Sequence, residues 1–325
     1  MAATRIAVIG AGIAGLLAAR RIADGGHTAV VVEKRETLGG RLATTRLAGA
    51  RLDDGAQFFT VRGPEFRALA DRWLAAGIAY EWCRGFDQPP RSPDGYPRYA
   101  GTGGMQTLAA ELAAGLEVHA GGAVTAITMQ RSGARLTLDD GTAIAAGGVV
   151  FTPPVPQALA LLDAGGIALD PAERDALDAI TYEPTIAVLA VLDRPSAVPP
   201  PGGVQPAGGA FSFVADNQAK GISDRPAVTL HAAGELSEAR WDDRDDDLLA
   251  DLLVEGRRWL GAEPVAAVLK RWRHARPVTL HPEAFLAVDG PVPCVFAGDG
   301  FKEARIEGAA RSGWAAAGAV LDLLR

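Results

Sequence analysis

The stretch that most constrains the fold of this chain is RIAVIGAGIAGLLAARRIADGGHTAVVVE, which begins at Arg5. It predicts a short apolar strand, a glycine-rich turn, a helix over Ala14–Gly25 and a second, β-branched strand over Thr28–Val32. Connections this short are typical of a β-α-β unit, in which the two strands lie parallel in one sheet. The start of the chain therefore predicts an α/β fold.

The glycines and the acid of this stretch indicate what it binds. Gly10 permits a tight turn after the strand, Gly12 lets the backbone approach a pyrophosphate, and Gly15 lets helix and strand pack closely. The free N–H groups at the helix N-terminus attract phosphate. Glu33 ends the second strand, about 20 residues after Gly12, where a carboxylate accepts hydrogen bonds from ribose hydroxyls and repels a 2′-phosphate. The pattern predicts a dinucleotide, but it does not separate a co-substrate from a resident cofactor.

Composition narrows the classes of partner. The chain has 325 residues, a net charge of −7 and 22% charged residues, and this acidic balance argues against a nucleic-acid partner. Cys83 and Cys294 are too few for a disulfide framework or a four-thiolate metal site, so no metal is expected. No apolar run reaches the ~18 residues of a membrane helix, and the N-terminus lacks the features of a signal peptide. We therefore expect a cytoplasmic enzyme with a small-molecule substrate, a monomer or weak dimer that contacts no membrane.

The order of the predicted elements indicates a discontinuous domain. Helices are predicted over 64–76, 104–114 and 304–324, and another follows the acidic run 242–247 as far as Leu260. Strands are predicted near 117–120, 123–130, 134–139, 149–152, 182–193, 210–215, 227–232 and 266–272. The Pro- and Gly-rich stretches 86–101 and 198–209 are predicted as loops. Nucleotide-type patterns lie at both ends with mixed strands between them, so both ends should meet in one sheet with a second sheet inserted.

Two motifs follow the acid. In GGRLATTR, Gly40 allows a loop to pass close to a ligand and Arg41 can pair with pyrophosphate, unless it is a solvated arginine on a surface loop. In RLDDGAQFFT, the small residues Gly55 and Ala56 allow a planar ring to lie against the backbone. Gln57 and Phe58 then frame a cavity, or the segment is a buried strand with core aromatics.

A fourth motif, FAGDGFKEARIEGAARSG, lies near the other end of the chain. A strand ends at Gly298, and the carboxylate of Asp299 can accept from a sugar-alcohol hydroxyl. A long helix then begins near Gly308 and Ala309, and its N–H groups suit the negative charge of a reduced flavin ring. An NAD-dependent dehydrogenase has no use for this motif, so the pattern favours a resident flavin dinucleotide.

At this point the sequence resembles the renalase family of FAD-dependent oxidoreductases, within the wider amine-oxidase-like flavoproteins. The four motifs carry the resemblance, together with VVFTPPVPQAL (149–159), FSFVADNQAKGI (211–222) and KRWRHARP (270–277). The last three segments are the more specific to renalases. The motif EARIEG carries extra charge near the expected flavin edge, and His274 stands where some relatives have an aromatic residue. These departures would suit the cavity wall to a different substrate.

The resemblance implies a Rossmann-like FAD-binding domain of the glutathione-reductase and p-hydroxybenzoate-hydroxylase type, with an inserted mixed-sheet substrate domain. We expect the first to comprise 1–75, 102–165 and 285–325, and the second 76–101 and 166–284. The cofactor would be non-covalent FAD. The residues expected to bind it are Gly10, Ala11, Gly12, Ile13, Ala14, Gly15, Glu33, Lys34, Gly40, Arg41, Gly55, Ala56, Gln57, Phe58, Val124, Thr152, Gly298, Asp299, Ile306, Glu307 and Ala309.

The function that the resemblance implies is oxidation of dihydro isomers of NAD(P)H, with O2 as electron acceptor. Because no second glycine motif is present, such a nicotinamide would enter the cavity over the flavin as a substrate. Gln57, Asn217 and His274 are the candidate polar residues of that cavity, since hydride transfer needs orientation more than acid–base groups. The alternatives are a flavin amine oxidase acting on a small amine and a flavin-binding redox protein of low turnover.

Overall fold

The computed structural model describes residues 3–86, 93–130 and 133–324 and divides the chain into two compact units. Unit 1 comprises residues 1–40, 109–181 and 277–325. Unit 2 comprises residues 41–108 and 182–276. Each unit therefore collects segments that lie far apart in the sequence, and each is described by itself.

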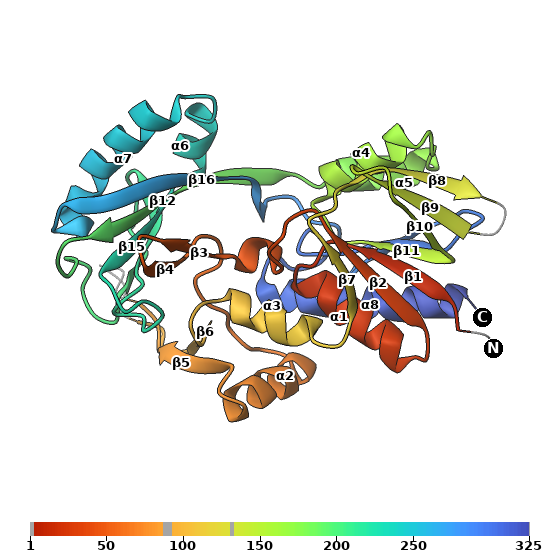
Figure 1. The fold of residues 1–325 in the computed structure, drawn as a ribbon, viewed down its shortest axis with the longest axis horizontal. Coiled ribbons are helices and arrows are strands. Elements are labelled where there is room, and N and C mark those ends of the chain that lie inside the picture. Colours follow the sequence, from red (N-terminus) through yellow and green to blue (C-terminus); the bar gives the residue numbers. More distant parts are fainter. Residues whose placement is uncertain (1–2, 87–92, 131–132, 325) are drawn as a thin grey trace. The chain divides into compact units, whose positions relative to one another are not determined.

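Unit 1 contains a six-stranded sheet in the order β17-β18-β11-β1-β2-β7 (Figure 1). The strands are β1 (Arg5–Ile9), β2 (Thr28–Glu33), β7 (Glu117–Ala120), β11 (Gly148–Phe151), β17 (Leu286–Val288) and β18 (Cys294–Phe296). All neighbours pair in parallel except β17 and β18, which are antiparallel. The central strands are buried apolar runs, as expected for a parallel sheet covered on its faces. The expectation that both ends of the chain enter one sheet is confirmed.

Two helices of unit 1 pack side by side against this sheet (Figure 1). They are α1 (Ile13–Asp24) and α8 (Ile306–Leu323), from opposite ends of the chain. Their approach is close, because a Cβ atom on Gly313 would lie 2.1 Å from the carbonyl oxygen of Ala14. The alanine-rich sequence of α8 buries Ala310, Ala316 and Ala317 in this layer.

The remaining elements of unit 1 form a second layer. Strands β8 (Val124–Gln130), β9 (Gly133–Leu138) and β10 (Ala143–Ala146) form an antiparallel sheet, with the predicted turn after Leu138. Helices α4 (Val155–Ala164) and α5 (Pro171–Asp178) follow β11, and α4 packs against β8.

Unit 2 is built around a five-stranded sheet in the order β13-β14-β15-β12-β16. The strands are β12 (Tyr182–Leu192), β13 (Gly203–Val204), β14 (Phe211–Asp216), β15 (Ala227–Ala232) and β16 (Pro264–Pro277). Helices α6 (Gly234–Ala239) and α7 (Asp245–Leu260) cover one face of this sheet (Figure 1). Val188, Leu230, Leu248 and Leu252 belong to the apolar core between these helices and the sheet.

The first part of unit 2 consists of short elements. Strands β3 (Thr44–Leu47) and β4 (Ala50–Asp53) form one hairpin, and β5 (Ala79–Cys83) pairs with β6 (Arg98–Gly101). Helix α2 (Pro64–Ala75) precedes β5. Helix α3 (Gln106–Ala113) spans the point where the chain passes from unit 2 to unit 1, and η1 (Gly40–Leu42) is a single 3-10 turn at the opposite passage.

The structure differs from the sequence-based expectations at several places. Residues 98–101, expected in a loop, pair as β6, while 87–92 of the same stretch lie outside the described residues. The division into units assigns 41–75 and 102–108 to unit 2, and 166–181 and 277–284 to unit 1, which differs from the expected boundaries. One reason is packing, because β4 lies against β15 of the five-stranded sheet.

Candidate functional site

The glycine loop of unit 1 has the geometry that dinucleotide binding requires. Gly10 has a φ of +96°, which only glycine adopts without strain, and its N–H donates to the carbonyl of Val32 on β2 at 2.8 Å. A Cβ atom on Gly15 would lie 2.0 Å from the carbonyl oxygen of Gly10, so only glycine lets α1 pack this close to the loop. The sequence-based roles of these two glycines agree with this geometry.

The N-terminus of α1 is suited to phosphate. Gly12 is the N-cap, and neither a capping side chain nor an acidic residue occupies the first turn, so its N–H groups are available to an anion. A Cβ atom on Gly12 would meet no atom within 4 Å, which leaves room for a pyrophosphate beside the backbone. Gly40 approaches this point, since its Cβ would lie 3.7 Å from Cα of Gly12. The residues therefore fit a dinucleotide phosphate.

Glu33 is buried at the end of β2, beside the loop. Its Oε2 accepts from the Ala11 N–H at 2.8 Å, and its Oε1 accepts from the Arg35 N–H at 3.1 Å. A carboxylate has further lone pairs beyond these two bonds, so it can still accept from ribose hydroxyls. The two backbone bonds hold the carboxylate in place for that contact.

Thr152 and the segment after β18 surround the same loop within unit 1. Thr152 Oγ1 donates to the carbonyl of Ile9 at 2.7 Å, which holds the end of β11 against the loop. The Gly298 N–H donates to Ser312 Oγ at 2.8 Å, which fixes the turn after β18 to α8. Glu307 is buried in the first turn of α8, and Ala309 is buried one residue beyond Gly308.

Two other predicted cofactor residues of unit 1 have local roles. Lys34 Nζ donates to Gln157 Oε1 at 3.1 Å on the surface. Val124 begins β8 and pairs with Leu138 of β9. The predicted cofactor residues of unit 2 are Arg41, Gly55, Ala56, Gln57 and Phe58. For every one of these residues, cofactor binding stays a prediction.

A buried polar cluster in unit 2 surrounds Asp53 at the end of β4. Its members, which we call the Asp53 cluster, are Asp53, Gln57, Asn217, Lys220 and Thr229. Lys220 Nζ lies 2.6 Å from Asp53 Oδ2, and both side chains are 0% exposed. Burial lowers the pKa of the Lys220 ammonium, and the neighbouring Asp53 carboxylate opposes that shift.

The other members link Asp53 to the sheet. The Asp53 N–H donates to Asn217 Oδ1 at 3.3 Å, and Asn217 Nδ2 donates to Thr229 Oγ1 at 3.0 Å. Thr229 Oγ1 donates in turn to the carbonyl of Asp53 at 2.9 Å. The side-chain amide of Asn217, a predicted cavity residue, therefore links β4 to β15 through these hydrogen bonds.

The side chain of Arg41 binds within unit 2. Its Nη1 donates to the carbonyls of His274 and Ala275 on β16, each at 3.2 Å. The guanidinium carries five N–H donors, and these two bonds fix its orientation against β16. The Arg41 carbonyl accepts from the Ala56 N–H at 2.8 Å, and a Cβ atom on Gly55 would lie 2.2 Å from that oxygen. Arg41 thus joins the 53–57 region to β16.

The remaining sequence candidates of unit 2 are aromatic. The His274 ring lies edge-on to Tyr182, with the ring centroids 5.3 Å apart. Phe58 packs with Phe86 and Phe213, and the Arg98 guanidinium lies 5.5 Å from the Phe58 ring centroid. Phe58 is only partly buried, so both interpretations of its ring stay open.

Sequence reasoning missed Asp53 and Lys220. They lie 167 residues apart, so no local spacing joins them. The available signal was Asp53 itself, an acid at the end of a mostly buried strand. A buried carboxylate needs a partner cation or several hydrogen-bond donors.

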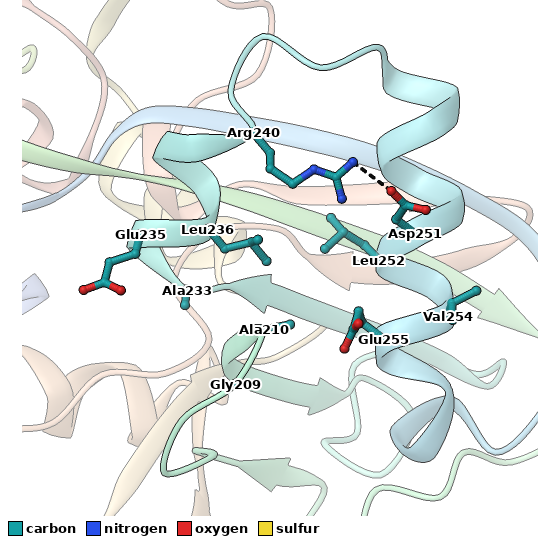
Figure 2. Close-up of a pocket in the computed structure, with 10 residues that line it drawn as sticks. All are labelled: Gly209, Ala210, Ala233, Glu235, Leu236, Arg240, Asp251, Leu252, Val254 and Glu255. Atoms are coloured by element: carbon teal, nitrogen blue, oxygen red, sulfur yellow. Dashed lines mark hydrogen bonds and ion pairs between the residues drawn. The ribbon is translucent and has the colours of Figure 1, made fainter.

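A surface cavity of about 690 Å³ lies elsewhere in unit 2, between α6, α7 and the loop before β14 (Figure 2). Arg240 reaches across it to Asp251 at 2.8 Å, as the dashed line in Figure 2 shows. Its lining includes Leu236, Leu252 and Glu255, and it shares no residue with the glycine loop or the Asp53 cluster. This cavity is therefore not the predicted site.

The part of the chain that the structure describes contains neither a metal-binding cluster nor a membrane-spanning helix. Over residues 3–86, 93–130 and 133–324, no group of three or more His, Cys, Asp or Glu side chains could hold a metal ion. In that same part of the chain, the helices are too short or too polar to cross a bilayer.

Comparison with known proteins decides the family. The model of the family described as flavin containing amine oxidoreductase matches residues 77–321. The chain belongs to this family. A model described as NAD(P)-binding Rossmann-like domain matches residues 8–73, which include the glycine loop. Membership confirms the resemblance at the level of the wider amine-oxidase-like flavoproteins, and the second match confirms the expected Rossmann-like domain.

The similar sequences cover short parts of longer proteins. Putrescine oxidase of Kocuria rosea is 37% identical over 101 residues, which are 31% of this chain and 20% of that enzyme. Coproporphyrinogen III oxidase of Mycobacterium bovis is 34% identical over 108 residues, 29% of this chain and 24% of that enzyme. The matches thus span a quarter or less of these relatives. The names of these relatives indicate different substrates. The similarity in the matched parts therefore reflects the shared flavoprotein framework and does not identify a substrate.

A solved structure shares the fold over almost the whole chain. The structure of wild-type putrescine oxidase bound to putrescine has a TM-score of 0.71, with 17% identity, and covers 99% of each chain. At this identity the likeness shows the fold alone. It confirms the predicted α/β architecture with a Rossmann-like domain.

Proposed function

We propose that this protein is an FAD-dependent oxidase that removes a hydride from the carbon next to the nitrogen of a small amine. The observation that carries the proposal is the family match over residues 77–321, which extends through both units. The balance is simple: the amine loses two electrons and two protons to become an imine, and O2 gains them to become hydrogen peroxide. When bound, FAD supplies the acceptor for the hydride.

The residues of unit 1 would hold the ADP half of the cofactor. The N–H groups after Gly12 would bind the pyrophosphate, and Glu33 would accept from the ribose hydroxyls. Asp299 and the first turn of α8 would serve the remaining length of FAD, as the sequence predicts. In unit 2, Gln57 and His274 remain the proposed substrate residues.

A second candidate is the renalase-type reaction, with a dihydro isomer of NAD(P)H as the reductant. One observation favours it: FSFVADNQAKGI, a segment through which the sequence resembles renalases, supplies Asn217 and Lys220 to the Asp53 cluster. Both reactions take a hydride from a ring or chain carbon activated by nitrogen. They differ in the size of the substrate and in the product, which is an aromatic pyridinium ring for a dihydronicotinamide and an imine for an amine.

Anaerobic reduction of the bound flavin distinguishes these candidates. The FAD-loaded protein is mixed without O2 with putrescine and a panel of monoamines, and separately with 2- and 6-dihydro-NAD(P), while absorbance near 450 nm is followed. The proposal expects rapid bleaching by at least one amine and peroxide release when O2 is admitted. Bleaching by dihydronicotinamides alone would overturn it in favour of the second candidate. Bleaching by neither would leave a redox protein of low turnover.

A further inference from the structure

We infer that Lys220 is a positioning residue for the oxidase reaction, acting by fixing the loop of residues 53–57. We call this segment the 53–57 loop. The inference rests on the proposed function, since the sequence assigns Gly55, Ala56 and Gln57 of this loop to the cofactor. Lys220 belongs to the loop after β14, 167 residues from Asp53 along the chain.

The ion pair of Lys220 and Asp53 is buried and its carboxylate is fully used. Asp53 Oδ2 accepts from Lys220 Nζ at 2.6 Å. Asp53 Oδ1 accepts from Thr44 Oγ1 at 2.6 Å and from the Met105 N–H at 2.8 Å. A buried carboxylate with three such donors has one geometry, because any rotation leaves a charge without a partner in a medium that does not solvate it.

Lys220 is itself held from several sides. The hydroxyl of Tyr80 donates to its backbone carbonyl, and its Nζ lies 5.1 Å from the Trp82 ring centroid. The Lys220 N–H donates to the carbonyl of Asp216 at 2.9 Å. The ammonium therefore cannot follow Asp53 if the loop moves, and the ion pair restrains the loop.

The restraint determines how Gln57 faces a ligand. Gln57 Nε2 donates to the carbonyl of Asp53 at 2.7 Å and to that of Gly55 at 3.1 Å, so both of its N–H bonds are used. Its Oε1 lies 3.4 Å from Lys220 Nζ, which excludes the flipped amide because that would set an NH2 group against the ammonium. Gln57 can therefore only accept a hydrogen bond. A ligand group at this carboxamide must be a donor, such as the N–H of an amine.

The test removes the charges together. Asp53→Asn with Lys220→Met replaces an ion pair by neutral residues of similar shape, whereas Lys220→Met alone would strand a buried carboxylate. Ser237→Ala is the matched control in unit 2, because Ser237 is wholly buried, its Oγ accepts from the Ile186 N–H at 3.0 Å, and it lies outside the Asp53 cluster. Both variants and the wild type are measured for the FAD dissociation constant and for the rate constant of anaerobic flavin reduction per bound flavin.

We expect the double variant to bind FAD about tenfold more weakly or to reduce its bound flavin about tenfold more slowly, the factor typical of a lost charge-assisted hydrogen bond. Ser237→Ala should change neither quantity, although both variants lower the yield of folded protein. A double variant that matches the wild type in both quantities would overturn the inference. If no amine reduces the wild-type flavin, the proposed substrate class fails, and the FAD dissociation constants still decide the role of Lys220.

Discussion

At the scale of single residues, His231 makes the folded protein sensitive to acid. It lies on β15, its Nε2 donates to the carbonyl of Asp54 at 3.2 Å, and burial lowers its pKa to about 4, with the Lys220 charge adding to the shift. The unfolded chain has the ordinary His pKa of ~6.5, so between these values only the unfolded state binds the proton. Stability is therefore lost as the pH falls from about 6.5 to about 4, by about 3 kcal/mol in all.

Urea unfolding at pH 7 and pH 4.5 measures this loss in the wild type and in His231→Gln. The free energy of unfolding of the wild type should fall by about 2 kcal/mol more than that of the variant over this range. Between pH 7 and pH 8 the two proteins should run parallel, because His231 is neutral in both states there. An equal fall in both proteins below pH 6.5 would assign the acid sensitivity to carboxylates instead.

The glycines expected to bind a dinucleotide could be predicted because their spacing along the chain is a recognisable local pattern. Gly10, Gly12 and Gly15 lie within one turn, and their geometry follows from the order strand, turn, helix. Asp53 and Lys220 could not be predicted, because their pairing depends on how β4 and β14 are arranged in unit 2. The role of Asn217 was predicted as a cavity residue for its chemistry, while its contacts tie two strands together.

At the scale of elements, the contact of α1 with its loop separates two glycines that look alike in sequence. Gly12 has φ −73° and ψ 176°, which alanine also adopts, and its Cβ would meet open space. Gly12→Ala should therefore fold with an unchanged melting temperature and lose at least tenfold in FAD affinity, because the methyl group takes the room of the pyrophosphate.

Gly15→Ala should fail in the opposite way. Its Cβ would lie 2.0 Å from the carbonyl oxygen of Gly10, so α1 must move away from β1. We expect a loss of about 3 kcal/mol in the free energy of unfolding, at the upper end of overpacking costs. Denaturant unfolding of both apo proteins checks the contrast, and an equally stable Gly15→Ala would show that the helix shifts at no cost.

Elements with strong periodicity were predicted within a few residues, and so were short strands such as β7 and β11, whereas the hairpin of β3 and β4 was not predicted. The helices α2, α7 and α8 and the strands β12 and β15 follow clear apolar patterns. The hairpin of β3 and β4 has only four residues in each strand, too few for alternation to stand out. Helices α4 and α5 begin with prolines, which sequence reading takes as loop signals although proline is well placed in a first helical turn.

At the scale of the whole molecule, FAD should stabilise the folded chain and FMN should not. A ligand that binds only the folded state at 100 times its dissociation constant adds about 2.7 kcal/mol. For a chain of this size that corresponds to a rise of roughly 5 °C or more in melting temperature. FMN lacks the adenosine and the second phosphate that the loop and Glu33 are built to hold, so thermal unfolding with each flavin checks the prediction. Equal shifts with both would place the flavin binding outside the glycine loop.

The domain boundaries were the least predictable feature at this scale. A sequence pattern shows where strands lie but not which sheet each joins, and the family resemblance led us to expect residues 41–75 in the domain of the glycine loop. The hairpin of β3 and β4 instead belongs with the five-stranded sheet, through contacts of β4 with β15 that no local pattern reveals.

The packing of α1 against α8 has a consequence for synthesis, because the two helices come from opposite ends of the chain. The glycine loop leaves the ribosome early, while the helix that packs against Ala14 follows roughly 290 residues later. At translation speeds of about 5–20 residues per second, that delay is roughly 15 to 60 seconds. Unit 2 is synthesised entirely within this interval. During this interval the nascent chain therefore exposes the flank of α1 that α8 covers in the folded protein.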